Sequence, residues 1–567
     1  MVERGHSLAF IAGVAGAKDW LKQNAPLGLL CLALLASAVL LLALSSGLTF
    51  FQDTWEFLMN RRGFTVDAFL KPHNEHIVVI PVAIEQLFLR LFGMTSATPE
   101  YVWLTVSLLA TAVLVFVYVR RRAGPWPALM AAVLLLFLGP AWQDLLWPFE
   151  IGFVGSVLFG IAMLLALDRD ERRWDVAACS FLALSIGFSS LGLAFAVGAV
   201  VDVFQKRASR GLRRAYVAAI PLLLYAVWWA GWGHDAESHL SLHNVLASPL
   251  YLMEGLAISI DSLLGLSTIT GAEIDPPRWA PLLVALIVLL VYRQVRKPSF
   301  SPRLWPVVAS AATFWLLAAF NYIHGREAYT SRYIYAGAAF VLLLVANLLK
   351  GVRIGKWALL IGGLVTLAAV ASNLTPLKEG RNWLKAQTVR TRADLAAIEI
   401  AQRTVDPSFS LTPEIAGNPT LIDVQAGKYL AAVRDYGSPA YTPAELANAP
   451  EAGRLQADIV LAHALPVTTE IKEGVAVPTS RGGCVSIPGG AGSSAPPLTL
   501  RPGMTKIELA SGGPGTIRLR RFATSEYSLV TEGIPGGSMT LLRIPRDRVT
   551  LPWRLQVEGA QLARICR

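Results

Sequence analysis

Repeated apolar runs constrain this chain more than any other feature of its sequence. The first run extends from Gly28 to Phe50, and comparable runs recur as far as residue 372. A run of roughly 20 apolar residues is what a helix needs to cross the hydrocarbon core of a bilayer. Charged residues make up only 16% of the chain, whereas a soluble domain carries about 25%. The sequence therefore predicts an integral membrane protein, with the lipid bilayer as its first partner.

The basic residues divide the connecting loops into two classes. Lys18 and Lys22 precede the first run, and Arg120, Arg121 and Arg122 close the second. Because loops rich in lysine and arginine stay in the cytoplasm, these clusters predict a cytoplasmic N-terminus and about 11 crossings. The formal net charge of +11 thus records topology. It does not indicate a nucleic-acid partner.

The expected fold class is a polytopic α-helical membrane protein. Residues 176–204 have basic clusters on both sides, so two short helices turning near residues 187–190 satisfy the charge rule where one crossing would break it. Residues 77–93 are apolar but contain Glu85 and Arg90, which favours an interfacial helix. The other spans are expected at about 28–50, 101–119, 126–139, 151–167, 215–233, 279–292, 304–322, 333–349 and 357–372.

The last third of the chain is polar and rich in glycine and proline, and it falls on the extracytoplasmic side. We expect a transmembrane domain at 1–375, a helical or mixed α/β segment at 376–470 and an all-β, sandwich-like domain at 471–567, where short β-type runs alternate with turns. Cys484 and Cys566 lie in this region, and outside the cytoplasm they can form a disulfide between the first and last strands. Two free thiols are the alternative.

A polar island at residues 51–76 follows the first span directly and belongs to an outer loop, 51–100, that we expect to be catalytic. Asp53 and Glu56 stand three positions apart, so one helical turn would place both carboxylates on one face. A carboxylate at the membrane surface can act as the general base that takes a proton from an attacking hydroxyl. The alternative is an acid pair that marks the end of a helix at the interface.

The island ends in His73-Asn74-Glu75-His76. Two histidines with a glutamate could ligate a divalent metal ion, although the spacing is not that of a known zinc motif. Hydrogen bonds to phosphate or to sugar hydroxyls are the more useful interpretation. The sequence contains no Walker motif and no GxGxxG, so nucleotide binding has no support.

Two further groups fall on the same predicted side. Arg326, Arg332 and Tyr333 lie at the mouth of one span, and guanidinium groups bind phosphate oxygens bidentately. Snorkelling to lipid headgroups is the alternative. The second of these two groups combines indoles with carboxylates, which suits stacking on sugar rings. An interfacial aromatic belt is the alternative. Its members are Trp142, Gln143, Asp144, Trp147 and Glu150, and the belt is the favoured interpretation for Trp147 alone.

This arrangement resembles the GT-C class of membrane glycosyltransferases, of the mannosyl- or arabinosyltransferase type. The resemblance is carried by the acid after the first span in Gln52-Asp-Thr-Trp-Glu56, by the paired short helices at 176–204, by Ser331-Arg-Tyr333 and by the outer C-terminal domain. The stretch Lys71-Pro-His-Asn-Glu-His76 also looks like a loop motif of uncharacterised bacterial proteins placed in this class. Many members have two adjacent acids, which this sequence lacks, so the choice between Asp53 and Glu56 stays open.

The resemblance implies a hexosyl- or pentosyltransferase of the bacterial plasma membrane that uses a polyprenyl-phosphate sugar as donor. Asp53 would be the base, with Glu56 as helper or alternative. Arg326 and Arg332, together with His73 or His76, would hold the donor phosphate. A glycan, lipid or protein would be the acceptor, and the anomeric centre would invert.

Two other classes compete with the enzyme. A transporter or flippase of lipid-linked saccharides carries charges within its spans, whereas the charges here concentrate in the outer loops. A non-catalytic protein of cell-envelope assembly would work mainly through the C-terminal domain. The charge distribution favours the enzyme.

Overall fold

The computed structural model describes residues 3–567 except 170, 206–210, 278, 280–284, 286–288, 290–291, 293–295, 297–301, 413–414, 416–420, 422–423, 471–483, 489–497, 501–502, 510–514, 536–538, 545–548, 550, 559–561 and 567. The chain forms two compact units. The first, here called the helical unit, comprises Met1–Ser46, Gly63–Ile84 and Thr98–Trp383. The second, the mixed unit, comprises Gly47–Arg62, Glu85–Ala97 and Leu384–Arg567.

Within the described ranges, five helices are long and apolar enough to cross a membrane, and a bent helix pair makes six if it counts as one span. The bent pair is α6 (Pro125–Leu136) with the η1–α7 segment Gly139–Leu146, at an angle of 43°. The five single helices are α1 (Glu3–Ser45), α5 (Thr98–Ala123), α8 (Ile151–Leu167, counted as a span from Pro148), α16 (Ser331–Leu348) and α17 (Lys356–Ala401). The chain is thus a polytopic helical membrane protein.

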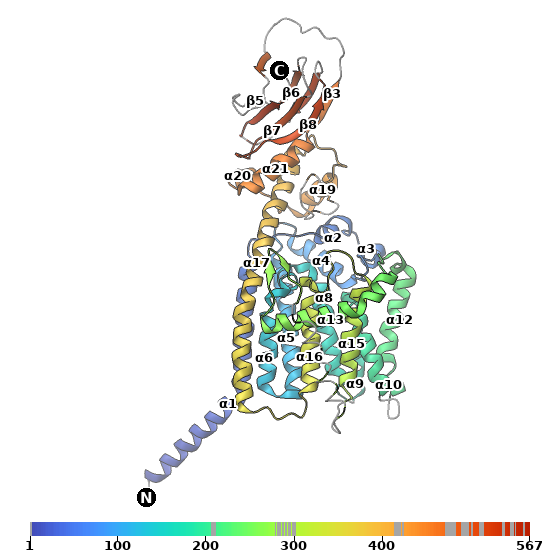
Figure 1. Cartoon of the computed structure of the whole chain (residues 1–567), viewed down its shortest axis with the longest axis vertical. Helices are drawn as coiled ribbons and strands as arrows, with labels where there is room; N and C mark the ends of the chain where they lie inside the picture. Colours follow the sequence, from blue (N-terminus) through green and yellow to red (C-terminus); the bar gives the residue numbers. More distant parts are fainter. Residues whose placement is uncertain are drawn as a thin grey trace. The chain divides into compact units, whose positions relative to one another are not determined.

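Shorter helices complete the helical unit (Figure 1). The two half-length helices expected within 176–204 are confirmed as α9 (Arg172–Phe188) and α10 (Gly192–Gln205). The chain turns sharply between them. The turn requires glycine at position 192, because a Cβ there would lie 2.5 Å from the backbone nitrogen of Ile186. The other short helices are α12 (Tyr216–Gly231), α13 (Leu242–Leu264) and α15 (Leu304–Phe320). The span expected at 279–292 lies largely outside the described residues, and the count of about 11 stays a prediction.

Helices α5, α8 and α16 run in the same direction through the helical unit. Arg122, at the end of α5, bonds both oxygens of Asp168 after α8 at 3.0 and 3.1 Å, and Asn347 of α16 at 3.1 Å. We call this the basic end. The beginnings of α8 and α16 therefore share the opposite end, here called the loop end, together with residues 71–76.

The mixed unit gathers segments from both halves of the sequence. Helix α2 (Thr54–Asn60), in the polar island, packs on α19 (Ala426–Tyr436), where the rings of Trp55 and Tyr429 lie 6.3 Å apart. Trp55 is completely buried, so burial of an indole holds this part of the outer loop to the C-terminal third. Helix α17 continues through residue 375 without a break, and the expected domain boundaries at 375 and 470 stay predictions.

The remaining helices of the mixed unit are α4 (Val79–Phe92, shared with the helical unit), α20 (Pro443–Ala447) and α21 (Glu451–Ala464). Within 406–470, where the sequence favours a mixed α/β segment, the described residues form mainly helices. The short helix α3 (Val66–Leu70) and the strand pair β1 (Ile269–Thr270) and β2 (Glu273–Ile274) belong to the helical unit.

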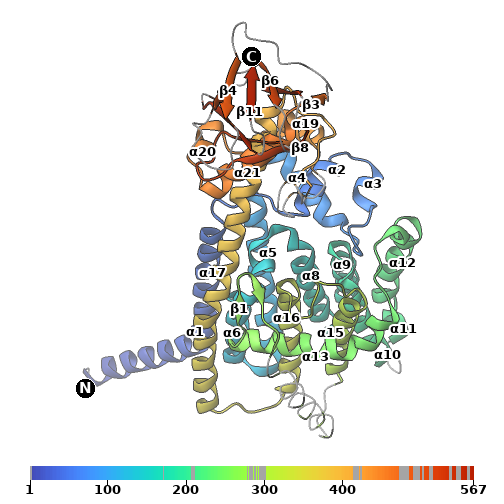
Figure 2. The ribbon, with the colours of Figure 1, turned by 45° about the horizontal axis from the view of Figure 1, so that its top comes forward.

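Two antiparallel sheets follow the helices of the mixed unit (Figure 2). One has the order β5-β10-β7-β8 and the other β3-β9-β6-β11-β4. Ile517, Leu519 and Leu555 bury one face of the first sheet, and Ile507 and Leu542 lie buried in the second. The strands are β3 (Val467–Glu470), β4 (Cys484–Pro488), β5 (Leu498–Leu500), β6 (Gly503–Leu509), β7 (Gly515–Arg520), β8 (Ser528–Ile534), β9 (Met539–Ile544), β10 (Trp553–Glu558) and β11 (Leu562–Cys566).

The two C-terminal cysteines face each other in the strand register. Strands β4 and β11 pair antiparallel, with Cys484 directly opposite Cys566. Opposed residues of an antiparallel pair have Cα atoms about 4.5–5.5 Å apart, which is within the roughly 4.4–6.8 Å that disulfides bridge. The register supports the expected disulfide, which stays a prediction.

Candidate functional site

The end of the polar island forms a tight backbone hairpin at the loop end of the helical unit. His73 and His76 exchange backbone hydrogen bonds of 3.0 and 2.9 Å. Asn74 takes a φ of +49°, in the left-handed region that asparagine tolerates better than most residues. The turn fixes Glu75 and the two imidazoles relative to one another.

The break between α9 and α10 holds this hairpin in place. The hydroxyl of Ser190 donates to the carbonyl of Glu75 and accepts from the backbone N–H of Ile77, both at 3.2 Å. On the other side, the backbone N–H of Glu237 donates to the carbonyl of Asn74 at 3.2 Å. The hairpin is therefore fastened to two separate segments.

Glu75 meets a residue 251 positions later in the chain. Nη1 of Arg326 bonds both carboxylate oxygens of Glu75 at 2.9 Å, and the Arg326 side chain is only 11% exposed. Nε2 of His76 lies 3.5 Å from the same carboxylate. The two sequence groups expected at the donor phosphate thus come together, and they form an ion pair.

The electrostatics follow from burial and from this pairing. Burial raises the pKa of Glu75, but the charges of His76 and Arg326 outweigh it and hold that pKa below its usual 4.5. Burial lowers the pKa of His76 below its usual 6.5, although Glu75 opposes the shift. At neutral pH the group is therefore a carboxylate, a guanidinium and an uncharged imidazole.

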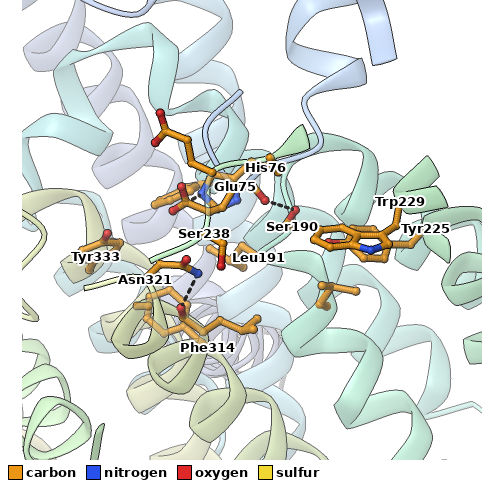
Figure 3. A pocket seen from close by; sticks show the side chains of 16 residues that line it. Glu75, His76, Ser190, Leu191, Tyr225, Trp229, Ser238, Phe314, Asn321 and Tyr333 are labelled. Carbon is orange, nitrogen blue, oxygen red and sulfur yellow. Dashed lines mark hydrogen bonds and ion pairs between the residues drawn. The ribbon is translucent and has the colours of Figure 1, made fainter. Parts of the chain in front are cut away.

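A cavity of about 220 Å³ opens beside this group (Figure 3). Its polar lining includes Glu75, His76, Ser190 and Asn321. Aromatic and aliphatic side chains form most of the remaining wall. They are Phe153, Leu191, Leu193, Tyr225, Trp229, Phe314, Leu317 and Tyr333. The cavity joins a charged group to an apolar wall, as a ligand with a polar head and an apolar tail requires.

Aromatic rings fix the two imidazoles. His73 packs edge-on against Phe149, with ring centroids 5.1 Å apart, and His76 packs against Phe153 at 5.4 Å. Phe153 in turn stacks on Tyr333 at 6.2 Å. The start of α8 and the start of α16 thus both support the histidine hairpin.

A second polar group lies where α7 (Trp142–Leu146) meets the start of α16. The backbone N–H of Arg332 donates to Oε1 of Gln143 at 3.1 Å, and the Ser331 hydroxyl donates to the carbonyl of Pro140 at 2.7 Å. Nη2 of Arg332 lies 3.3 Å from the carbonyl of Gly325. The start of α16 at Ser331 and Arg332 is therefore held by two separate segments, 140–143 and Gly325.

Asp144 is completely buried in this group, and Glu150 is 5% exposed. Within the described part of the chain, neither carboxylate oxygen of Asp144 has a hydrogen-bond partner. An ionised carboxylate without partners is expensive to bury, so such a residue needs a functional or structural explanation.

Stacking on a sugar ring is not available to the two indoles of this segment. Trp142 and Trp147 are each 2% exposed. Trp142 packs against Trp383, with centroids 5.5 Å apart, and its indole N–H donates to the carbonyl of Ala272. The expected role of Trp142 as a sugar platform is therefore corrected, because both indoles belong to the core.

Asp53 and Glu56 belong to the mixed unit. Glu56 accepts from Nε and Nη2 of Arg61 at 3.2 and 3.1 Å, and Arg61 stacks over the ring of Phe57. Asp53 stands before the first turn of α2 without capping it through its side chain. The carboxylate of Glu56 is thus already engaged by a cation.

The histidine hairpin does not assemble a metal site in this structure. Among the described residues, no group of three or more His, Cys, Asp or Glu side chains is placed to hold a metal ion. The idea of a divalent metal at His73 and His76 therefore gains no support.

Sequence reasoning missed several residues of the cavity, chiefly Ser190, Phe153 and Trp229. The only signal for Ser190 was its place in the turn between two short helices. The fold and the site together define a polytopic helical membrane protein with a charged, amphiphilic cavity at one end of its helices.

No protein-family model matches this sequence, and no curated protein matches it. One structure that the chain resembles is the crystal structure of ArnT from Cupriavidus metallidurans bound to undecaprenyl phosphate, at 14% sequence identity and a TM-score of 0.44. The likeness covers 74% of this chain and 89% of that chain. At this level a likeness does not by itself establish a shared fold or a shared activity.

Proposed function

We propose that the protein is a membrane glycosyltransferase that takes a sugar from a polyprenyl-phosphate donor. The observation that carries the proposal is the cavity lined by Glu75 and His76 at one end and by apolar side chains elsewhere, with Arg326 paired to Glu75. A polyprenyl-phosphate sugar has the same two parts, a polar sugar phosphate on a hydrocarbon chain. The membrane-spanning helices suit a donor that never leaves the bilayer.

Arg326 and Arg332 are the candidates for holding the donor phosphate. Nη1 of Arg326 bonds the carboxylate of Glu75. Within the described residues, Nε and Nη2 of Arg326 make no hydrogen bond, so they can donate to phosphate oxygens. The phosphate is the leaving group, and charge develops on it as the glycosidic bond breaks. Cationic donors fixed at that position lower the barrier. His73, Asn74 and His76 would contact the sugar hydroxyls.

Asp53 is our candidate for the general base that takes the proton from the acceptor hydroxyl as that oxygen attacks the anomeric carbon. Glu56 is the weaker candidate, because Arg61 already holds its carboxylate. Attack from the face opposite the phosphate would invert the anomeric centre. The acceptor would be a glycan, a lipid or a protein on the extracytoplasmic side of a bacterial plasma membrane.

The test is transfer of radiolabel from a panel of polyprenyl-phosphate hexoses and pentoses to cell-envelope material, with purified protein in nanodiscs. Asp53→Asn should reduce transfer about 100-fold or more, as loss of a general base does. Glu56→Gln should have the smaller effect, and Asp67→Asn, at an exposed position of the same island, serves as the matched control. Full activity in both Asp53→Asn and Glu56→Gln would overturn the assignment of the base.

Movement of a lipid-linked saccharide across the membrane is a second candidate. The buried, unpartnered carboxylate of Asp144 favours it, because ionisable groups inside transmembrane bundles often mark transport pathways. A fluorescent polyprenyl-phosphate saccharide in proteoliposomes distinguishes the two. Translocation without formation of a new glycosidic bond would identify a flippase and not a transferase. If the protein showed neither activity, a non-catalytic role in envelope assembly would remain.

A further inference from the structure

Three arginines lie on the solvent-facing side of the four-stranded sheet in the mixed unit. The register of β7 and β10 places Arg554 directly opposite Arg520, and Gln556 directly opposite Arg518. Residues alternate between the two faces of a strand, and the buried Ile517, Leu519 and Leu555 occupy the other face. Arg518, Arg520 and Arg554 therefore share one face, which we call the arginine face.

Two cations in directly opposed positions work against the sheet. Opposed residues have Cβ atoms about 4.5–5.5 Å apart, and like charges at that distance destabilise the pair. On β7 and β10, Glu558 is the acid of this face among the described residues, and it is engaged by Arg518 at 3.1 Å and by Gln556 at 3.1 Å. The exposed Glu532 follows on the next strand, β8. Arg554 is exposed, and among the described residues no hydrogen bond or ion pair of its side chain is found.

The neighbouring arginine is held in a fixed orientation. The guanidinium of Arg520 lies 4.2 Å from the centroid of the Tyr527 ring, and its Nη1 donates to the carbonyl of Thr524 at 2.8 Å. The turn that carries Thr524 is itself tied down, since Glu451 of α21 accepts from the backbone N–H groups of Thr524 and Ser525 at 2.7 and 2.8 Å.

A buried carboxylate holds the same turn through backbone hydrogen bonds. Asp458 of α21 accepts from the backbone N–H groups of Arg521, Phe522 and Ala523 at 2.8–3.0 Å. A guanidinium that is fixed before a ligand arrives loses less side-chain entropy on binding. The hairpin thus presents a pre-ordered cation beside an aromatic ring.

We propose that the arginine face binds an acidic glycan, meaning a carbohydrate polymer that carries carboxylate or phosphate groups. Guanidinium groups bind such anions bidentately. Tyr527 offers a ring, and Gln556 and Thr499 offer an amide and a hydroxyl for sugar hydroxyls, with Thr499 opposite Arg554 in the register. This binding activity does not depend on the reaction proposed for the helical unit.

The described side chains around the arginine face favour a polar ligand over a membrane or an apolar protein partner. Among the described residues of the two sheets, no large hydrophobic side chain is exposed. Membrane-inserting faces and protein interfaces usually offer exposed aromatic or aliphatic anchors. A polar polyanion needs no such anchor.

The experiment measures binding of fluorescent oligogalacturonate to the full-length protein in nanodiscs of neutral lipid. Methyl-esterified oligogalacturonate and dextran are the uncharged probes. The double variant Arg520→Gln, Arg554→Gln should weaken binding about tenfold or more, and Arg554→Lys should fall between it and the wild type, because lysine lacks the bidentate fork. Arg543→Gln, at an exposed position on β9 of the other sheet, should stay within about twofold.

Stability provides a second readout. Arg554→Gln removes the repulsion with Arg520, so its thermal midpoint should equal or exceed that of the wild type while binding falls. Unchanged binding in the double variant, or an equal loss in Arg543→Gln, would refute the arginine face. Equal affinity for dextran would remove the charge requirement. Equally tight, arginine-dependent binding of a DNA oligonucleotide or of anionic vesicles would replace the acidic glycan with a general affinity for polyanions.

Discussion

The two ends of the helical unit both bury charged side chains, but they treat them differently. At the basic end Arg122 bonds Asp168, Asn347 and a backbone carbonyl, and it lies 3.5 Å from the ring of Tyr118. At the loop end Asp144 is buried without a partner within the described residues. A satisfied network stabilises a single packing arrangement, whereas an unsatisfied buried ionisable group is of the kind found at functional sites.

A second cation at the basic end follows the same pattern. Arg214 bonds Asp175 through Nε at 2.7 Å, approaches Asp202 at 3.8 Å and reaches the carbonyls of Leu167 and Arg169. A buried charge by itself therefore does not distinguish a ligand-binding site from a structural network. The loop end differs because Glu75, although paired with Arg326, also lines a cavity.

The largest effect should come from breaking the basic end. Arg122→Met leaves Asp168 buried without its main partner, which costs about 3–5 kcal/mol of unfolding free energy. Denaturant unfolding in detergent measures the loss. Arg121→Met is the control, since Arg121 is 36% exposed and lies 3.9 Å from Asp168. A wild-type unfolding curve for Arg122→Met would mean that this network does not stabilise the fold.

The second effect tests the loop end through Glu75→Gln. The amide cannot balance the charge of Arg326, so the orientation of the guanidinium and of His76 is lost. Transfer activity should fall about 100-fold, while the unfolding free energy drops by only about 1–3 kcal/mol. Glu171→Gln, at a side chain 53% exposed, is the control and should change neither quantity. Loss of stability without loss of activity would mean that Glu75, like Asp168, stabilises the fold and takes no part in the reaction.

The third prediction compares two isosteric changes. Asp168→Asn removes the charge that Arg122 needs and should cost about 1–3 kcal/mol. Asp144→Asn keeps the shape of a buried carboxyl group that forms no ion pair among the described residues, so stability should stay within about 1 kcal/mol or rise. Both are measured by denaturant unfolding. An equal loss in the two variants would erase the distinction between the ends.

The smallest effect concerns pH. The pKa of His76 in the folded protein lies below its usual 6.5 because the ring is buried, so the unfolded chain binds the proton more tightly. Stability should therefore fall as pH drops below 6.5, and again below 4.5, where Glu75, whose pKa is also lowered, takes up its proton. Thermal midpoints across pH measure the slope. His76→Gln should flatten the upper part of it, whereas His324→Gln, at a fully exposed ring, should not.

The sequence predicted the helices better than the site. The charge rule foresaw α9 and α10, and the expected span 151–167 coincides with α8, because hydropathy and flanking charges are local properties. The pairing of Glu75 with Arg326 depends on a fold that brings together residues 251 positions apart, and no local pattern encodes it. Trp142 shows the same limit, since an indole beside carboxylates has one sequence pattern whether it is buried or exposed.

The short helices determine how the bilayer meets this protein. Helices α9, α10, α12 and α15 have 17, 14, 16 and 17 residues, and they pack together where Cys179 meets Tyr216 and Gly198 meets Ser310. At 1.5 Å per residue they extend about 21–26 Å, less than the roughly 30 Å hydrocarbon core. A helix shorter than the hydrocarbon core is accommodated by local thinning of the bilayer, by snorkelling of flanking side chains or by association with other helices. The flank also contributes Leu191, Trp229 and Phe314 to the cavity wall, so the cavity lies beside these short helices.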